Sequence, residues 1–176
     1  DGAERRRHLR RALPFDALGV VDAPAPAQSS LNHQVAEFAW RVKNALRPKG
    51  LANLGLPCQL MGTGMAFPWS VIAASDLENA HLAEDLRLGL DLAAQGHWPL
   101  FCADAVVTSH FPTTAAGAAT QRERWEAGHV DILRTAAPAY AARALRRGDV
   151  RLLAMVLDVC VPPLSLLALL TAAMLG

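Results

Sequence analysis

The chain has 176 residues, which gives room for one domain of ordinary size. Its net charge of +1 provides no overall attraction to nucleic acid, so we expect no nucleic-acid partner. The hydrophobic fraction of 52% and the mean hydropathy of +0.19 are high for a soluble domain, and the excess gathers near the C-terminus. The three cysteines have no C-x-x-C spacing, which argues against a zinc site or a disulfide framework and fits a reducing compartment.

The first part of the chain predicts a strand between two helices. Residues 3–13 read as a short basic helix whose arginines form a solvated face, with contact to anionic lipid or phosphate as the alternative. Residues 17–22 predict a short buried strand that ends in an acid, and two prolines make residues 23–30 a loop. A helix over residues 31–46 would end at Arg47-Pro48-Lys49-Gly50 and turn one apolar face inward, made of Val35, Phe38, Val42, Ala45 and Leu46.

The middle of the chain continues this alternation. Residues 55–67 are rich in glycine and predict short strands, with residues 57–61 as strand and core, and Pro68-Trp69-Ser70 starts a helix. A helix over residues 84–94 buries Leu86 and Leu90. Residues 99–109 predict one or two strands, residues 111–117 a loop, and residues 118–147 a long helix kinked at Pro138. Alternating helices and strands indicate an α/β sheet domain.

The apolar segment from Leu152 to Leu175 has the length to cross a bilayer, but Pro162-Pro163 divides it. We therefore expect an interfacial helix over residues 150–161, with Asp158 at its wet edge, followed by the start of a spanning helix. The alternative is the buried C-terminal helix of a soluble protein. Arginines before the segment predict that this side faces the cytoplasm: Arg143, Arg146, Arg147 and Arg151. The chain begins at Asp1 without a signal peptide and ends within an apolar run, so we expect a piece of a larger enzyme.

Asp85 is a candidate general base. It follows Glu84 at the start of a predicted helix, where the helix dipole favours the ionised carboxylate. Acids in the first turn of a helix are also routine stabilisers, so this position alone leaves both interpretations open.

Gln121, Arg124 and Trp125 share one face of the predicted long helix. A guanidinium suits phosphate oxygens, and an indole offers a flat surface on which a sugar ring can pack. Gly62, Thr63 and Gly64 match no phosphate-loop pattern, and a tight turn is the simpler interpretation of these residues.

Taken in order, the acidic pair, the Q-x-x-R-W signature and the apolar C-terminal segment resemble the membrane-associated family 2 glycosyltransferases over about residues 28–170. These include cellulose synthase-like and hyaluronan synthase-like enzymes. The resemblance implies an α/β fold: a partial GT-A-like (nucleotide-diphospho-sugar transferase) domain with a C-terminal membrane-associated helical segment. Residues 1–27 would be a remnant of the donor-binding half, residues 28–147 the acceptor-side catalytic region, and residues 148–176 the interfacial or transmembrane segment.

The same resemblance implies inverting hexosyl transfer from a nucleotide sugar to a polysaccharide or lipid-linked acceptor at the cytoplasmic side of a membrane. Asp85 would be the catalytic base. The residues that bind the acceptor and the diphosphate would be Gln121, Arg124, Trp125, Gly62, Thr63, Gly64 and Glu84.

The chain departs from the family at the metal motif. Members bind Mg²⁺ or Mn²⁺ through a D-x-D motif, and here only Asp22 matches, because Pro24 occupies the second acidic position. We therefore expect this chain alone to be inactive as a transferase. The alternative is a non-catalytic, membrane-associated saccharide-binding remnant. A hydrolase is disfavoured, since the chain has no G-x-S-x-G nucleophile turn.

Overall fold

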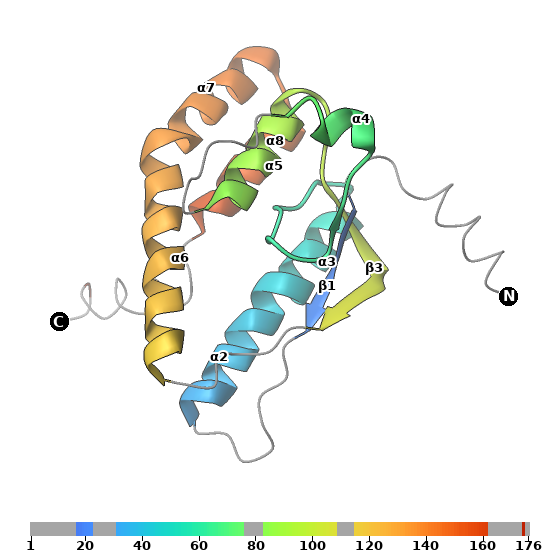
Figure 1. The fold of residues 1–176 in the computed structure, drawn as a ribbon. Coiled ribbons are helices and arrows are strands. Elements are labelled where there is room, and N and C mark those ends of the chain that lie inside the picture. The colour runs from blue at the N-terminus through green and yellow to red at the C-terminus, as the bar shows by residue number, and fades with distance from the viewer. Residues whose placement is uncertain (1–16, 23–30, 76–82, 109–114, 162–173, 175–176) are drawn as a thin grey trace, which may run out of the picture.

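The computed structural model describes residues 17–22, 31–75, 83–108, 115–161 and 174. Helices predominate, and they surround a small sheet (Figure 1). The predicted basic helix at residues 3–13, the loop at 23–30 and almost all of the apolar segment after Val161 lie outside these residues. Among the helices of the described ranges, none combines the length and apolarity needed to cross a bilayer.

The sheet has three strands in the order β2-β1-β3. Strand β1 (Ala17–Asp22) confirms the predicted first strand and pairs in parallel with β3 (Leu100–Thr108), with an irregularity after Gly19. Strand β2 (Met65–Ala66) pairs antiparallel with β1. The prediction of a strand over residues 57–61 was wrong, although Pro57, Cys58, Gln59 and Leu60 are buried as expected of core.

The helix predicted over residues 31–46 continues beyond the stop that we expected. Helix α2 (Leu31–Arg41) passes through a π-helical turn, η1 (Val42–Leu46), into α3 (Arg47–Asn53). Proline has no N–H to donate and its ring crowds the carbonyl four residues earlier, so Pro48 is incompatible with a regular α-turn. The π-turn removes this conflict: Arg47 donates its N–H to the carbonyl of Val42.

The inward face predicted for this helix was wrong at three of its five positions. Val35, Phe38 and Leu46 are exposed and Val42 and Ala45 are half-buried, whereas Asn44 and Pro48 are buried. Asn44 donates its amide to the carbonyl of Trp40 at 2.9 Å, which satisfies a polar group inside the protein. The helix therefore turns part of its polar side toward the protein.

Four helices form the main core. Helix α5 (Glu84–Ala94) has the predicted bounds, while the long predicted helix is two: α6 (Ala115–Thr135) and α7 (Ala137–Arg147), which meet at Ala136 (Figure 1). Helix α8 (Val150–Cys160) completes the group, and Asp149 caps it by accepting the N–H of Leu152. The central side chains are almost fully buried: Leu90, Ile132, Leu152, Met155 and Val159.

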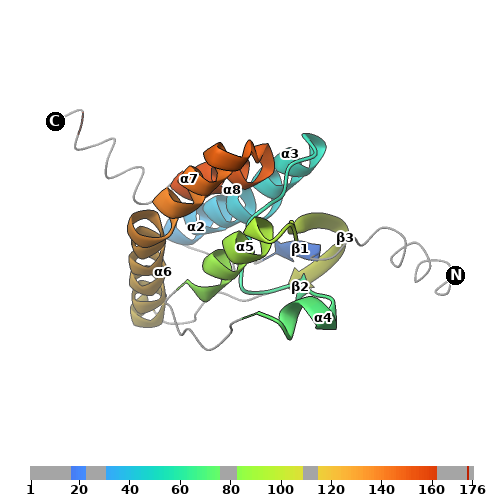
Figure 2. The ribbon, with the colours of Figure 1, turned by 90° about the horizontal axis from the view of Figure 1, so that it is seen from above.

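A second, smaller core forms between α5 and the segment that precedes it in sequence. Leu60, Leu92 and Val71 pack together, and Val71 belongs to the short helix α4 (Trp69–Ile72), which starts where predicted. Gly89 lets α5 approach closely, because an added Cβ would lie 3.3 Å from the Leu60 side chain. Figure 2 shows α5 between the helices α3, α7 and α8 on one side and α4 with β2 on the other.

Asp158 lies inside the protein rather than at a wet helix edge. Its carboxylate forms an ion pair with Arg47 and accepts a hydrogen bond of 2.7 Å from Gln59, and Arg47 also donates to the Asp158 carbonyl at 2.8 Å. The placement expected for Asp158 was therefore wrong. Helix α8 packs into the protein core through four side chains: Leu152, Met155, Val156 and Val159.

Substituting Asp158 should measure how much this bridge stabilises the fold. In Asp158→Asn the half-buried guanidinium of Arg47 loses its counter-charge, so we expect the free energy of unfolding to fall by about 1–3 kcal/mol. Asp104→Asn is the matched control: Asp104 is exposed on β3, and its loss should change stability by less than about 0.5 kcal/mol. Urea denaturation of the three proteins provides the comparison. Equal stability of the two variants would contradict a structural role for the bridge.

Candidate active site

Asp85 lies in the first turn of α5, partly buried, with one carboxylate oxygen accepting the N–H of Leu86 at 2.8 Å. The other oxygen faces the glycine turn, since a Cβ on Gly62 would lie 3.3 Å from Asp85 Oδ2. Glu84 precedes it and is exposed. The structure thus brings together Asp85 and Gly62, two residues predicted separately from the sequence.

Burial raises the pKa of Asp85, and the Leu86 N–H and the positive charge of Lys43 partly oppose this shift. The adjacent Glu84 carboxylate raises the pKa of Asp85 further. A carboxylate with a raised pKa accepts a proton more readily at neutral pH than an ordinary aspartate does. The environment of Asp85 is therefore suited to a general base.

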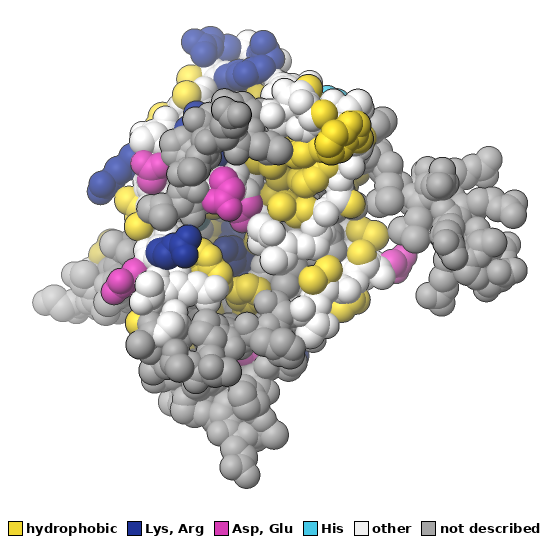
Figure 3. All heavy atoms as spheres, viewed as in Figure 1, with side chains coloured by type: hydrophobic (Ala, Val, Ile, Leu, Met, Phe, Trp, Pro, Cys, Tyr) yellow, Lys and Arg dark blue, Asp and Glu magenta, His cyan; other side chains and the backbone are white. Residues whose placement is uncertain are grey.

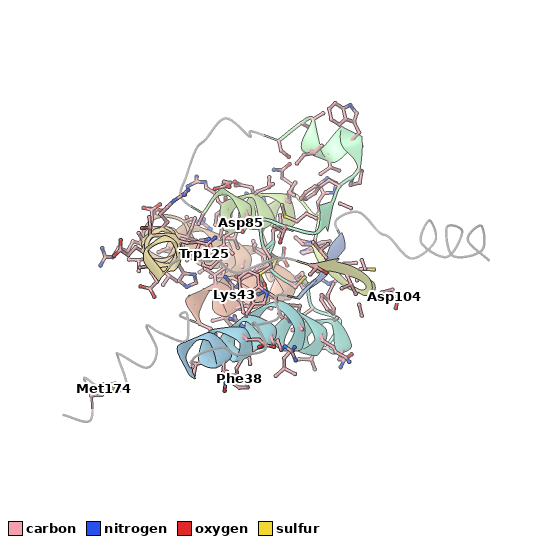
Figure 4. All side chains as sticks on the ribbon, turned by 60° about the horizontal axis from the view of Figure 1, so that its bottom comes forward. Phe38, Lys43, Asp85, Asp104, Trp125 and Met174 are labelled. Carbon is pink, nitrogen blue, oxygen red and sulfur yellow. The ribbon has the colours of Figure 1, made fainter. Side chains whose placement is uncertain are left out.

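Lys43 is a neighbour of Asp85 that the sequence analysis missed. It lies on η1, the π-helical turn that Pro48 requires, and its side chain remains accessible. Enough protein surrounds the amine that burial lowers its pKa, while Asp85 raises it. Figure 4 shows Lys43, Asp85 and Trp125 around one central region, with Phe38 and Asp104 toward the outside.

The predicted Gln-Arg-Trp face lies on α6, and all three side chains are exposed. The Trp125 ring, 46% exposed, lies against Trp40 of α2 with the ring centroids 5.8 Å apart and the planes at 35°. This contact joins α6 to α2 and leaves part of the indole open to a ligand. Gln121 lies about one helical turn before Trp125, and Arg124 directly precedes it in sequence.

The glycine turn comes directly before β2. Gly62 and Gly64 both have a positive φ, +75° and +69°, and Thr63 between them is exposed. At Gly62 the absence of a side chain serves two purposes: it permits this backbone conformation and leaves room for Asp85. Figure 3, drawn in the same view as Figure 1, shows acidic and basic side chains around a hollow in the surface.

A second polar group adjoins Lys43. His129 is buried on α6, one turn after Trp125. Burial lowers the pKa of His129, and the positive charges of Lys43 and Arg47 add to this effect. The helical periodicity of α6 was a signal for His129, because it follows Trp125 by four residues. Lys43 and Gln59 had no comparable signal.

Asp22 ends β1, opposite Thr108 of β3, and its side chain is outside the described atoms. Within the described residues, no group of three or more His, Cys, Asp or Glu side chains could hold a metal ion. The charged groups that act on Asp85 are Lys43 of η1 and the adjacent Glu84. The family generally uses a divalent metal, and the described residues show no site for one.

The candidate residues are thus a partly buried aspartate, a glycine turn beside it, and an exposed helix face that carries amide, guanidinium and indole groups. The model of the family described as glycosyl transferase family group 2 matches residues 24–175. The chain belongs to this family, and the family supports a glycosyl transfer role and a GT-A-like nucleotide-sugar transferase fold. No curated protein matches the chain significantly.

Stability as a function of pH tests the environment of Asp85. Its pKa is higher in the folded than in the unfolded chain, so the ionised carboxylate costs stability at any pH above the folded value. This cost disappears as the pH falls below the unfolded value of about 4. Asp85→Asn should therefore melt at a higher temperature than the wild type at pH 7 and at the same temperature near pH 3.

Thermal melts by circular dichroism across this range measure the difference. Asp104→Asn, on exposed β3, should follow the wild type throughout. If Asp85→Asn were less stable than the wild type at pH 7, the carboxylate would be stabilising the fold, and its assignment as a buried base would be wrong.

The glycine turn gives an independent prediction. Gly62→Ala places a Cβ against Asp85 in a backbone conformation that alanine disfavours, so the free energy of unfolding should fall by at least about 1 kcal/mol. Gly50→Ala is the matched control, because Gly50 lies within α3 with no atom near its added Cβ. There alanine should stabilise by about 0.5–1 kcal/mol. Denaturant titration measures the free energy of unfolding, which should fall in Gly62→Ala and rise in Gly50→Ala. An unchanged free energy of unfolding in Gly62→Ala would contradict the close approach to Asp85.

Proposed function

We propose that this chain is the acceptor-side catalytic region of an inverting glycosyltransferase, which moves a hexose from a nucleotide diphosphate to a hydroxyl of a polysaccharide or lipid-linked acceptor. The observation that carries the proposal is Asp85: a partly buried carboxylate of raised pKa that faces an open glycine turn. Its position in the motif order of the cellulose synthase-like and hyaluronan synthase-like enzymes supports the same role.

In the proposed step Asp85 takes the proton of the acceptor hydroxyl. The oxygen forms a bond to the anomeric carbon of the sugar, and the bond from that carbon to the diphosphate oxygen breaks on the opposite face. The nucleoside diphosphate leaves with the electron pair of the broken bond, and Asp85 releases its proton afterwards. A single displacement of this kind inverts the anomeric configuration.

The other predicted residues bind the donor diphosphate and the acceptor or shape the site around Asp85. Arg124 offers paired N–H donors to the departing diphosphate, and the open face of Trp125 packs against a sugar ring of the acceptor. Gln121 adds an amide on the same face. Gly62, Thr63 and Gly64 leave space beside the base, and Glu84 contributes negative charge that raises the pKa of Asp85. We place the site at the cytoplasmic side of a membrane, as the arginines before the apolar segment suggest.

The test is calorimetric titration of UDP and UDP-sugars into the full chain with and without Mn²⁺, followed by an assay of sugar transfer to oligosaccharides. The incomplete D-x-D motif predicts an inactive chain, so UDP binding is measured first. Where the wild type transfers sugar, Asp85→Asn should reduce transfer by at least about a hundredfold and leave UDP binding unchanged, because the base acts only in the chemical step. Arg124→Ala should weaken UDP binding. Asp104→Asn should match the wild type in both assays.

Two results would count against the proposal. Transfer that persists in Asp85→Asn would remove the base from the mechanism. Saccharide binding by a wild-type chain that neither binds UDP-sugars nor transfers sugar would instead favour the second candidate, a non-catalytic, membrane-associated saccharide-binding protein. That candidate draws its support from Pro24 in place of the second acid of the metal motif.

A further inference from the structure

A small cavity lies beyond the C-terminal end of α5, at the opposite end of the helix from Asp85. Its volume is about 320 Å³, and Trp98 and Leu100 give it apolar walls, while His97 and Arg151 add polar groups to its lining. Asp85 lies in the first turn of α5, and the axial rise of an α-helix puts about 15 Å between the two ends. The cavity is therefore separate from the candidate active site.

Trp98 holds Arg151 at this cavity. The guanidinium of Arg151 lies over the Trp98 ring, with its central carbon 5.0 Å from the ring centroid. Such a contact attracts the cation to the face of the indole and restricts the conformations of a long side chain. Trp98 itself packs against the main core, so the fold determines where the ring lies. Arg151 thus has a defined place in the lining although the residue is exposed.

The N–H donors of Arg151 remain available to a ligand. The contact with Trp98 engages the positive charge, whereas the donors lie at the edge of the guanidinium plane. Among the residues that the structure describes, no oxygen accepts a hydrogen bond from Arg151, and the nearby carboxylate of Asp149 accepts the N–H of Leu152. The indole nitrogen of Trp98 is buried, so we assign the ring a positioning role and no contact through that nitrogen.

The chain around Arg151 is positively charged. Arg146 and Arg147 lie in the last turn of α7, and Figure 3 shows basic side chains gathered at the α7 end of the molecule. Between residues 146 and 151 three arginines stand against one acid, Asp149. Because a phosphate monoester carries more negative charge than a carboxylate, it gains more from this surplus of positive charge.

We propose that this cavity binds a phosphate monoester, to which Arg151 donates paired hydrogen bonds while Trp98 keeps the guanidinium in place. The apolar walls at Pro57 and Leu100 contact the carbon part of the ester. A volume of about 320 Å³ is near the lower end of the range for small-molecule sites, so the ligand is a small ester or the head group of a lipid. The inference goes beyond the proposed function and does not depend on it.

Calorimetric titration of glycerol 3-phosphate into the full chain tests the site, at constant ionic strength. Glycerol lacks the phosphate and acetate carries a single charge, so these two compounds are the controls. We expect saturable binding of glycerol 3-phosphate, weaker binding of acetate and no binding of glycerol. Absence of saturable binding of glycerol 3-phosphate would overturn the proposal, and so would acetate that binds equally tightly.

Vesicle flotation distinguishes a lipid head group from a soluble ester as the source of the phosphate. The vesicles contain phosphatidylcholine alone, or phosphatidylcholine with an equal amount of phosphatidic acid or of phosphatidylglycerol. A site for a lipid head group prefers phosphatidic acid, whose phosphate is a monoester, and glycerol 3-phosphate then competes for it. A site for a soluble ester binds glycerol 3-phosphate but does not distinguish the two anionic vesicles.

Arginine variants separate the cavity from general positive charge. Arg151→Gln should weaken glycerol 3-phosphate binding about tenfold, as expected for lost hydrogen bonds between charged groups. Arg146→Gln is the matched control: it removes the same charge from a residue outside the lining, and screening should keep its effect below about twofold. Both residues are exposed, so both variants should retain the fold. Equal losses in the two variants would reject the cavity as the site.

Variants of Trp98 test its positioning role. Trp98→Phe keeps an aromatic face under the guanidinium and should retain most of the affinity, whereas Trp98→Leu should lose about as much as Arg151→Gln. Equal affinity of folded Trp98→Leu and Trp98→Phe would contradict this role. If Trp98→Leu does not fold, the comparison of Arg151→Gln with Arg146→Gln decides whether the cavity is the site.

One further comparison keeps this site apart from the proposed transferase. Arg124→Ala should leave glycerol 3-phosphate binding unchanged, and Arg151→Gln should leave UDP binding unchanged. If Arg124→Ala weakens glycerol 3-phosphate binding and Arg151→Gln does not, the ester binds at the candidate active site. That result overturns the inference and leaves the proposed function intact. Binding that depends on Arg151, in a chain that transfers no sugar, supports the cavity site and rejects the proposed reaction.

Discussion

The bridge from Arg47 to Asp158 and Gln59 holds together the parts of the chain from which the site is built. It joins the start of α3 to α8 and to the buried segment that leads into the glycine turn. Gln59 is three residues from Gly62, and Gly62 lies against Asp85. The position of the base thus depends on an ion pair formed by residues far apart in sequence.

The bridge also explains why the helix from residue 31 to residue 53 turns a polar side inward. A half-buried carboxylate requires a cation, and Arg47 provides it. Lys43 lies one turn earlier and is brought near Asp85 by the same orientation. Exposure of Val35, Phe38 and Leu46 follows from this, because a helix cannot direct both sides toward the protein. Electrostatic pairing decides the orientation here, ahead of hydrophobic periodicity.

The elements that the sequence predicted well are those set by local signals. The bounds of α5 follow from its apolar spacing and from the glycine after it, and the start of α4 follows from Pro68. Asp85, Gly62 and Trp125 became candidates through the motif order that resembles the family, because their local positions alone left other interpretations open. Long-range pairing could not be predicted in the same way. Nothing local in Leu157-Asp158-Val159 indicates that the acid is bound to Arg47, and an apolar surrounding suggested a membrane surface instead.

The π-turn shows a further limit of local signals. Arg47-Pro48-Lys49-Gly50 contains residues that end most helices, yet the helix continues, because one wider turn removes the conflict at Pro48. The extra residue in that turn also changes the direction of every side chain after it. A regular helical period therefore misplaces the side chains that follow the turn, including Arg47, which forms the bridge to Asp158.

A base at Asp85 has to be both strong and ionised at neutral pH, and the surrounding groups act on these two properties in opposite directions. Burial makes the carboxylate a stronger base, but the same burial disfavours its ionised form and so costs stability at neutral pH. Lys43 and the Leu86 N–H limit the shift, which keeps the carboxylate available to accept a proton. Lys43 remains accessible, so a ligand that displaces water around it strengthens its attraction to Asp85 and to any bound anion. Ligand binding would therefore change the basicity of Asp85 through Lys43, and the charge state of the site would depend on what occupies it.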